Sequence, residues 1–312
     1  MIETQSLTKR YGELTAVDNI SFKVEPGEVL GFLGPNGAGK STTMKMLTGF
    51  LAPTSGSAKV CGFDVQEQPI EAKRVLGYLP EGAPSYGEMT PLEFYRFVAE
   101  LRGISGEQAE KRIADVVARL QLSSVLLQPI DTLSKGFKRR VGLGQAILHD
   151  PKVLVLDEPT DGLDPNQKHE VRDLIRSMSR DKIIIISTHI LEEVHAVCSR
   201  AVIIAKGKLL ADATPSELEA RSRYHGAVSL TTVNPAALRD GLQRIEGVAA
   251  VEIDPQDGRL TAFPKKGARV FDKVSEFLRS QNVTFSELQL EQGRLDEVFR
   301  QITTQNAAGG RA

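Results

Sequence analysis

The feature that most constrains this chain is a glycine-rich loop between an apolar run and a helical stretch. Residues 34–41 read Gly-Pro-Asn-Gly-Ala-Gly-Lys-Ser and fit the spacing G-x-x-x-x-G-K-[ST]. The apolar run Val29–Leu33 precedes the loop, and residues 42–47 continue it as a predicted helix. Strand, loop and helix in this order form the scaffold of a phosphate site. A chance glycine-rich turn is the alternative, and the flanking strand and helix argue against it.

The residue types in this loop suit a nucleoside triphosphate. Glycines let backbone N–H groups curl around phosphate oxygens at the start of a helix, whose dipole favours negative charge. Lys40 is expected to reach the outer phosphates, and the Ser41 hydroxyl is expected to bind Mg²⁺. The residues expected to hold the nucleotide here are Gly34, Pro35, Asn36, Gly37, Ala38, Gly39, Lys40, Ser41 and Thr42.

Two adjacent carboxylates follow a second apolar run at residues 153–156. Asp157 is expected to hold the magnesium shell, and Glu158 is expected to be the general base that polarises a water. A strand that ends in Asp-Glu is common and usually marks a solvated loop. The assignment therefore depends on the phosphate loop elsewhere in the chain.

The order of predicted elements favours an α/β fold. The four isoleucines at 183–186 suit a strand that is buried on both faces, as in a parallel sheet. Amphipathic helices are predicted around 109–120 and 171–178, from apolar residues at helical spacing. Strands that alternate with helices in this way are typical of α/β domains.

The pattern changes near residues 221–226, where a second domain is expected to begin. Beyond this point the sequence predicts the order βαββαβ, with a hairpin about Asp257 and Gly258. That order is the ferredoxin-like arrangement of an α+β domain. A last amphipathic segment, 295–302, is expected to be a docking helix, and the end at 307–310 is expected to be frayed.

Composition narrows the setting in which the chain works. Its 312 residues carry 39 Lys and Arg against 40 Asp and Glu, a net charge of −1, so we expect no nucleic-acid partner. Cys61 and Cys198 stand apart in no CxxC pattern, which argues against a disulfide framework or a zinc site. We find no secretory signal and no run of about 20 apolar residues, and so expect a cytoplasmic chain.

Further landmarks stand in a fixed order around these motifs, and with them the chain resembles the ATP-binding subunits of ABC transporters over about residues 1–220. Tyr11 stands where that family stacks an aromatic ring on adenine, and residues 133–137, Leu-Ser-Lys-Gly-Phe, stand where it has its LSGGQ signature. Residues 161–164, Asp-Gly-Leu-Asp, resemble the family's D-loop, and His189 resembles its switch histidine.

The resemblance implies an architecture and a mechanism. It implies a P-loop ABC ATPase domain at 1–222, with a helical subdomain at about 84–150, and an accessory domain at 223–312. Two copies of the chain would sandwich ATP between the phosphate loop of one copy and Ser134 and Gly136 of the other, with Asp164 beside the nucleotide. Glu158 would orient water, while His189 and Lys40 stabilise the γ-phosphate during hydrolysis.

The same resemblance implies partners and a location. The ATPase dimer would drive a separate transmembrane permease and would sit peripherally on the inner face of the cell membrane. Its contact with the membrane would be indirect, through the permease.

The sequence departs from the family pattern at three positions. Lys135 and Phe137 replace a glycine and a glutamine of the signature, and Glu81 replaces the usual glutamine after Pro80. The variant signature and the variant at Glu81 both resemble a bacterial subgroup of drug-export, antibiotic-resistance and gliding-associated ATPases, which favours export. A carboxylate at Glu81 is expected to be a magnesium ligand, because it binds a hard cation more strongly than an amide does.

Each landmark residue also has a structural reading. Tyr11 alone would be a half-buried aromatic. Ser134 and Asp164 are natural N-caps, and His189 could be a structural hydrogen-bonding group. The basic run 138–140 is expected to be a solvated or salt-bridged helix face, and packing is the plainer account of the helix's later glycines.

The sequence lacks the features that rival functions would require. An ABC-type ATPase of DNA repair would carry long coiled coils, and a ribosomal one would repeat the cassette within the chain. A P-loop kinase has no reason to contain the Ser134 signature, and a GTPase would show a guanine-reading Asn-Lys-x-Asp motif.

Overall fold

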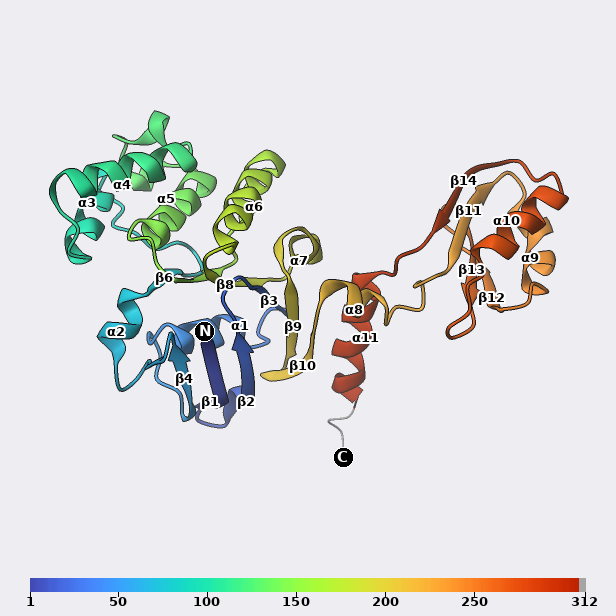
Figure 1. Cartoon of the computed structure of the whole chain (residues 1–312), viewed down its shortest axis with the longest axis horizontal. Coiled ribbons are helices and arrows are strands. Elements are labelled where there is room, and N and C mark those ends of the chain that lie inside the picture. Colours follow the sequence, from blue (N-terminus) through green and yellow to red (C-terminus); the bar gives the residue numbers. More distant parts are fainter. Residues whose placement is uncertain (309–312) are drawn as a thin grey trace. The chain divides into compact units, whose positions relative to one another are not determined.

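The structure, a computed structural model, describes residues 1–308 and the side chains of residues 1–304. The chain divides into two compact units, Met1–Thr214 and Pro215–Ala312 (Figure 1). This division falls before the expected boundary at 222/223, because helix α8 (Pro215–Glu219) packs against α11 (Leu295–Ala308) of the second unit. Of the end expected to be frayed, 307 and 308 close α11, and 309 and 310 lie outside the described residues.

The larger sheet of the first unit has six strands in the order β10-β9-β3-β8-β7-β6. Their bounds are β3 (Val29–Leu33), β6 (Leu76–Leu79), β7 (Val153–Asp157), β8 (Ile183–Thr188), β9 (Arg200–Ala205) and β10 (Lys208–Ala213). All pairings from β9 to β6 are parallel, and β10 pairs with β9 antiparallel. The carboxyl ends of β3, β8, β7 and β6 therefore meet at one edge of the sheet, where ligands of open α/β sheets bind.

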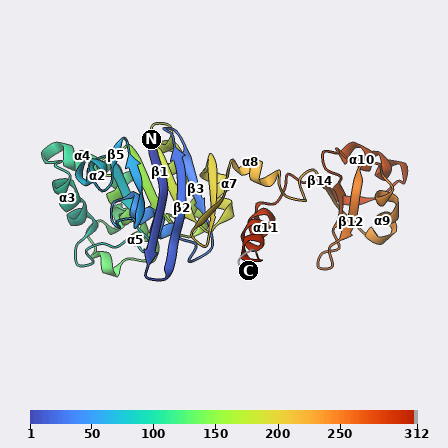
Figure 2. The ribbon, with the colours of Figure 1, turned by 90° about the horizontal axis from the view of Figure 1, so that it is seen from below.

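A second, antiparallel sheet of the first unit was not anticipated from the sequence. It has the order β2-β1-β4-β5, with β1 (Ile2–Tyr11), β2 (Leu14–Val24), β4 (Ser55–Val60) and β5 (Phe63–Asp64). Figure 2 shows β1 and β2 side by side. Helix α1 (Lys40–Leu47) contributes Met44, Met46 and Leu47 to a core that also contains Ile2 of β1 and Val155 of β7. The phosphate loop thus starts a helix that is anchored in one core with both sheets.

A group of helices forms the rest of the first unit (Figure 1). The helices are α2 (Pro69–Arg74), α3 (Pro91–Leu101), α4 (Gly106–Arg119), α5 (Lys135–Ile147), α6 (Pro165–Ser179) and α7 (Leu191–Val197), with short 3-10 turns at Ser123–Val125 and Ile130–Thr132. Thr90 and Glu93 form a capping box at the start of α3. The later glycines of α5 allow close packing, as expected, since a Cβ at Gly144 would lie 2.1 Å from Tyr95 Oη of α3.

The second unit contains the βαββαβ order expected from the sequence. Its elements are β11 (Val228–Thr232), α9 (Pro235–Gln243), β12 (Val248–Ile253), β13 (Leu260–Pro264), α10 (Phe271–Ser280) and β14 (Phe285–Leu290), and the antiparallel sheet has the order β12-β13-β11-β14. Leu242 of α9 and Val274 and Leu278 of α10 pack on Val228 and Leu230 of the sheet. This unit therefore has a hydrophobic core of its own.

Membrane-spanning helices are not a feature of the described residues. Within 1–308, no helix combines the length and the apolar character that crossing a bilayer requires.

Candidate functional site

The phosphate loop connects β3 to α1, as the sequence predicts. Two of its glycines are required by their surroundings. Gly39 has a φ of +103°, and a Cβ there would lie 2.5 Å from the Ala16 carbonyl oxygen. A Cβ at Gly34 would lie 2.5 Å from the Ile204 carbonyl oxygen. The loop is thus held closely against the ends of neighbouring strands.

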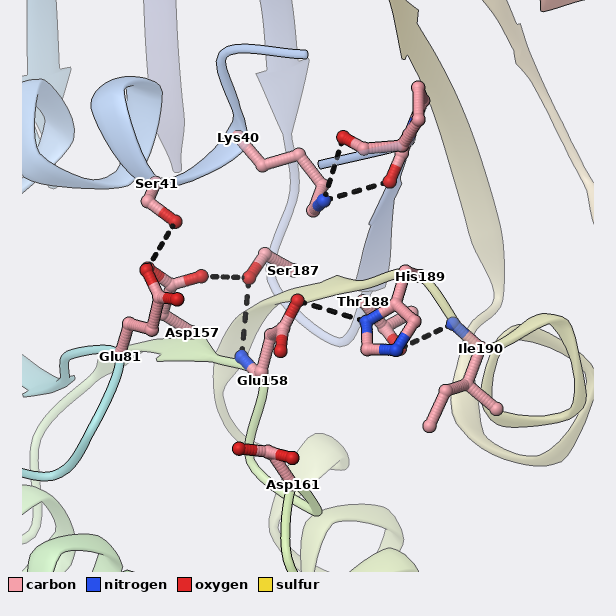
Figure 3. A network of polar contacts seen from close by, with 12 residues as sticks. Lys40, Ser41, Glu81, Asp157, Glu158, Asp161, Ser187, Thr188, His189 and Ile190 are labelled. Carbon is pink, nitrogen blue, oxygen red and sulfur yellow. Dashed lines mark hydrogen bonds and ion pairs between the residues drawn. The ribbon is translucent and has the colours of Figure 1, made fainter. Parts of the chain in front are cut away.

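Lys40 begins α1 and is almost fully buried, with 6% of its surface exposed. Its Nζ donates to the carbonyl oxygens of Gly34, at 2.7 Å, and Pro35, at 3.2 Å (Figure 3). Burial lowers the pKa of Lys40 below its usual value, and the carboxylates of the site oppose that shift. A desolvated ammonium group that donates to two loop carbonyl oxygens can neutralise the charge of a phosphate.

Three oxygen-bearing side chains gather at the ends of α1, β6 and β7, and they suit Mg²⁺. Ser41 Oγ lies 3.4 Å from Glu81 Oε2 (Figure 3). Asp157 is fully buried, and its Oδ1 accepts a hydrogen bond from Ser187 Oγ. Its Oδ2 is buried with no hydrogen-bond partner among the described residues. An unpaired buried carboxylate oxygen beside a hydroxyl and a second carboxylate fits the hard-oxygen ligands that Mg²⁺ prefers.

Glu158 follows β7 in an unusual backbone conformation, with a φ of +51°. Its N–H donates to the carbonyl oxygen of Ser187 at 3.0 Å and lies 3.2 Å from the Ser187 hydroxyl. Its Oε1 lies 3.0 Å from His189 Nδ1, and 18% of the side chain is exposed. A strained turn that is fixed by the next strand thus directs a carboxylate toward a histidine, as Figure 3 shows.

A buried carboxylate that the sequence did not single out joins the strand end before His189 to the segment before Asp161. Glu193 of α7 is 4% exposed, and its Oε2 accepts from Thr188 Oγ1 at 2.6 Å. Its other oxygen accepts from the hydroxyl of Thr160, just before Asp161. Burial raises the pKa of Glu193 above its usual value. The sequence contains one signal for this residue: a glutamate stands among the apolar residues of the helix predicted after His189.

The signature residues form a separate cluster at the start of α5. Ser134 is the N-cap, and its hydroxyl accepts from the Phe137 N–H at 3.3 Å. Lys135 Nζ pairs with Asp161 Oδ2 at 2.8 Å, and a Cβ on Gly136 would lie 2.8 Å from Gln167 Oε1. The contacts of this cluster in the described structure run to residues 161–167 rather than to the phosphate loop.

The other two expected nucleotide contacts have the structural roles anticipated for them. Asp164 is the N-cap of α6, and its Oδ1 accepts from the Gln167 N–H at 2.9 Å. Tyr11 ends β1 with half of its surface exposed, and the Lys9 ammonium lies 5.2 Å from the centre of its ring. An exposed ring at a strand end is accessible for stacking.

The expectation of a solvated or salt-bridged helix face at 138–140 is wrong for Arg139 and Arg140. Arg139 and Arg140 are buried, with 4% and 5% exposed, and both donate to backbone carbonyl oxygens. Lys138 Nζ donates to the Asp131 carbonyl oxygen at 2.9 Å. The acceptors of Arg139 and Arg140 lie at element ends that are distant in sequence, so these two side chains face carbonyl groups rather than solvent, whereas Lys138 is only partly buried.

Comparisons with known proteins agree with this geometry. The ABC transporter family matches residues 17–161. The linearmycin resistance ATP-binding protein LnrL of Bacillus subtilis is 30% identical over 306 residues, which cover 97% of this chain and 98% of LnrL. The chain belongs to the ABC transporter family. As an ABC transporter ATP-binding protein, it is also 37% identical to the Nod factor export ATP-binding protein I of Paraburkholderia xenovorans, over 77% of this chain and 80% of that protein.

Two further similarities show how much of a longer relative this ABC protein covers and which fold it has. The probable multidrug ABC transporter ATP-binding protein YbhF of Escherichia coli is 39% identical over 223 residues, and the chain spans 38% of its length. A solved ATP-binding subunit of an ABC transporter is 30% identical, with a TM-score of 0.66 over 70% of this chain and 92% of its own. The expected P-loop ABC ATPase fold is thereby confirmed.

Proposed function

We propose that this chain binds ATP with Mg²⁺ and hydrolyses it to power transport through a separate membrane protein. The observation that carries the proposal is the meeting of Lys40, Ser41, Asp157, Glu158 and His189 at the carboxyl ends of three adjacent parallel strands. This edge offers a phosphate loop, oxygen ligands for a metal and a carboxylate for water in one place.

The side chains divide the chemistry among them. The loop N–H groups and Lys40 bind the outer phosphates and stabilise the charge that develops on the γ-phosphate. Ser41, Asp157 and Glu81 would hold Mg²⁺, which supplies further positive charge beside the phosphates. Glu158 orients the attacking water and accepts its proton, and His189, 3.0 Å away, holds the Glu158 carboxylate in place.

Lys40→Ala tests the hydrolytic part. The variant should lose ATPase activity by a factor of about 10² or more, because it loses the charge that faces the γ-phosphate. Wild-type protein without magnesium-dependent ATPase activity would contradict the proposal. So would a folded Lys40→Ala protein that turns over at the wild-type rate.

The signature cluster supports a site completed by a second copy of the chain. The N-terminal turn of α5, with the Ser134 hydroxyl and the close backbone of Gly136, suits a phosphate, yet its own contacts run to residues 161–167. We infer a head-to-tail homodimer in which this turn meets the phosphate loop of the partner. Asp164 and Tyr11 would lie beside the same nucleotide.

Mixed dimers test the sharing. A subunit with Ser134→Arg paired with one carrying Lys40→Ala has one intact site if sites are shared, and the other site carries both changes. Each homodimer of either variant should be inactive, whereas the mixed dimer should retain one active site. A mixed dimer in which both sites are dead would refute the shared site.

A groove beside β6 offers a surface for the proposed permease. It has a volume of about 810 Å³, and β6 contributes Leu76 and Tyr78 to its wall. Exposed Phe50, Ile70 and Leu101 line it, and the cationic side chains in its wall outnumber the single acidic one, Glu100. The cationic side chains are those of Lys73, Arg74, Arg102 and Arg112. This combination fits an amphipathic segment of a partner with acidic residues. Because β6 leads directly to Glu81, a partner in the groove would touch the strand that carries a site residue.

A binding measurement tests the groove. The double variant Phe50→Asp and Ile70→Asp should reduce co-purification with the membrane-spanning partner while ATP binding persists. Both side chains line the groove, and neither belongs to the phosphate loop, because Phe50 follows α1 and Ile70 lies on α2. Leu127→Asp is the matched control, because Leu127 is 73% exposed and outside the groove. Equal partner binding by the groove variant and the control would place the permease elsewhere.

Export is the direction that the relatives favour. The names of the similar proteins refer to multidrug transport, Nod factor export and linearmycin resistance. A 26% identical structure belongs to a protein of an ABC transporter complex, and we infer that this chain is held peripherally at the inner face of the membrane by its permease. ATP-dependent accumulation of cargo inside inverted membrane vesicles would support export, and ATP-dependent loss from them would indicate import.

A further inference from the structure

A buried arginine on the signature helix connects the backbones of two site segments. Arg139 lies on α5, and its side chain is 4% exposed. Its Nη1 donates to the Pro80 carbonyl oxygen at 3.0 Å. Its Nη2 donates to the carbonyl oxygens of Asp157 and Glu158. One guanidinium thus joins the end of β6 to the end of β7.

These three carbonyl groups are placed where small movements matter. Pro80 directly precedes Glu81, which lies 3.4 Å from the Ser41 hydroxyl. Asp157 and Glu158 carry the proposed metal ligand and the proposed base. A shift of either backbone would move a carboxylate relative to the phosphate loop. Misplacement of a reacting group by about 1 Å can lower a rate by about 10²-fold.

The same helix holds β6 at further points, so Arg139 acts from a rigid element. Gln145 Nε2 donates to the Tyr78 carbonyl oxygen at 2.5 Å. A Cβ on Gly142 would lie 2.7 Å from the Ala83 Cβ, which shows how closely the helix and the segment after β6 approach. The guanidinium geometry suits this role, because its planar fork can donate to several acceptors at once.

We propose that Arg139 is a positioning residue for ATP hydrolysis, which holds Glu158 and Glu81 in register with the phosphate loop. The inference rests on the proposed ATPase function and adds a residue outside the family motifs described above. A purely structural role is the alternative, since buried cations that bind carbonyl groups also stabilise a fold.

The next residue provides a matched control. Arg140 is 5% exposed, and its guanidinium donates to the Leu120 carbonyl oxygen at 3.1 Å. Its guanidinium also lies 4.4 Å from the centre of the Phe137 ring. Arg140 therefore matches Arg139 in residue type, helix and burial, but its carbonyl contact lies among the helices rather than at the strand ends.

The experiment compares Arg139→Gln, Arg139→Lys and Arg140→Gln in the full chain, with kcat and KM for ATP measured at saturating magnesium. Both Arg139 variants should lose kcat by at least about tenfold with KM changed by less than about threefold, because the nucleotide cradle stays intact. Arg140→Gln should leave kcat within about threefold of wild type. The melting temperatures of Arg139→Gln and Arg140→Gln should fall by comparable amounts.

Each outcome is decisive. Folded Arg139 variants with wild-type kcat, or equal kcat losses in Arg139→Gln and Arg140→Gln, would overturn the proposal. If Arg139→Gln does not fold, Arg139→Lys decides, because one ammonium cannot reach all three carbonyl groups. Failure of both Arg139 variants to fold, while Arg140→Gln folds, would mean a structural role. A wild-type chain without ATPase activity would instead refute the proposed function.

Discussion

His189 Nδ1 lies 3.0 Å from Glu158 Oε1, and the two residues directly follow neighbouring parallel strands. The Glu158 carboxylate is mostly buried, whereas half of the His189 side chain is exposed. The histidine therefore holds a carboxylate whose free oxygen can reach water, while its own outer edge stays accessible to a phosphate. A substitution in this pair can therefore abolish hydrolysis while nucleotide binding persists.

Glu158→Gln should abolish turnover and leave ATP binding intact. The amide retains the shape of the side chain and can still contact His189, but it cannot accept a proton from water. The fall in rate should be about 10²-fold or more, and the ATP-bound variant should accumulate as a dimer in size-exclusion chromatography. An undiminished rate would refute Glu158 as the base.

Glu81→Gln should weaken the magnesium dependence of ATP binding. Glu81 Oε2 lies 3.4 Å from the Ser41 hydroxyl, so its charge faces the place expected for Mg²⁺. Without the metal, the same carboxylate would repel the γ-phosphate across a partly desolvated site. Titration of ATP binding against magnesium should give a shallower curve for the variant. Superimposable curves would show that Glu81 only occupies an exposed loop.

The stability of the first unit should fall as the pH drops from about 6.5 toward 4. His149 Nε2 lies 3.1 Å from the Leu76 carbonyl oxygen, and burial together with the nearby cations Arg102, Arg112 and Lys182 lowers the pKa of His149 to about 4. Between these pH values His149 is protonated in the unfolded chain but neutral in the folded chain. The contribution of neutral His149 to the free energy of unfolding is therefore fully present above about pH 6.5 and is lost as the pH falls. After a discount for partial exposure, it amounts to at most about 2 kcal/mol.

His149→Gln tests this pH dependence. The amide can keep the hydrogen bond to Leu76 and does not titrate, so the variant should lose that part of the slope in thermal unfolding between pH 4 and 6.5. His169→Gln is the control, because His169 is exposed on α6. Identical slopes for wild type and His149→Gln would assign the acid sensitivity to other groups.

A chain that ends at Thr214 should fold and bind ATP. All the residues proposed to contact nucleotide or metal lie at or before His189, and the first unit has its own core. We propose that the second unit docks or regulates rather than catalyses. Circular dichroism and a fluorescent ATP analogue would check the shortened chain. Loss of nucleotide binding by a folded product would give the second unit a part in the site.

Much of the site could be predicted because its signals are local. The spacing of residues 34–41 contains the backbone shape and the lysine that a phosphate requires, and the apolar run before Asp157 identifies the end of a buried strand. The βαββαβ order of the second unit also followed from periodicity, since β11, α9, β12, β13 and α10 each bury apolar residues, whereas the last strand, β14, is largely exposed. These inferences needed no knowledge of which segments lie side by side.

The sequence by itself determined the phosphate loop, the two carboxylates after β7 and the α/β class, because each depends on residues that are adjacent in the chain. Tertiary structure alone decided the sheet of β1, β2, β4 and β5, whose pairing joins distant segments. It also decided the burial of Glu193 and Arg139. A charge in a sequence predicts solvent, and these two are buried because the fold brings hydroxyl groups or carbonyl oxygens from other strands within hydrogen-bonding distance.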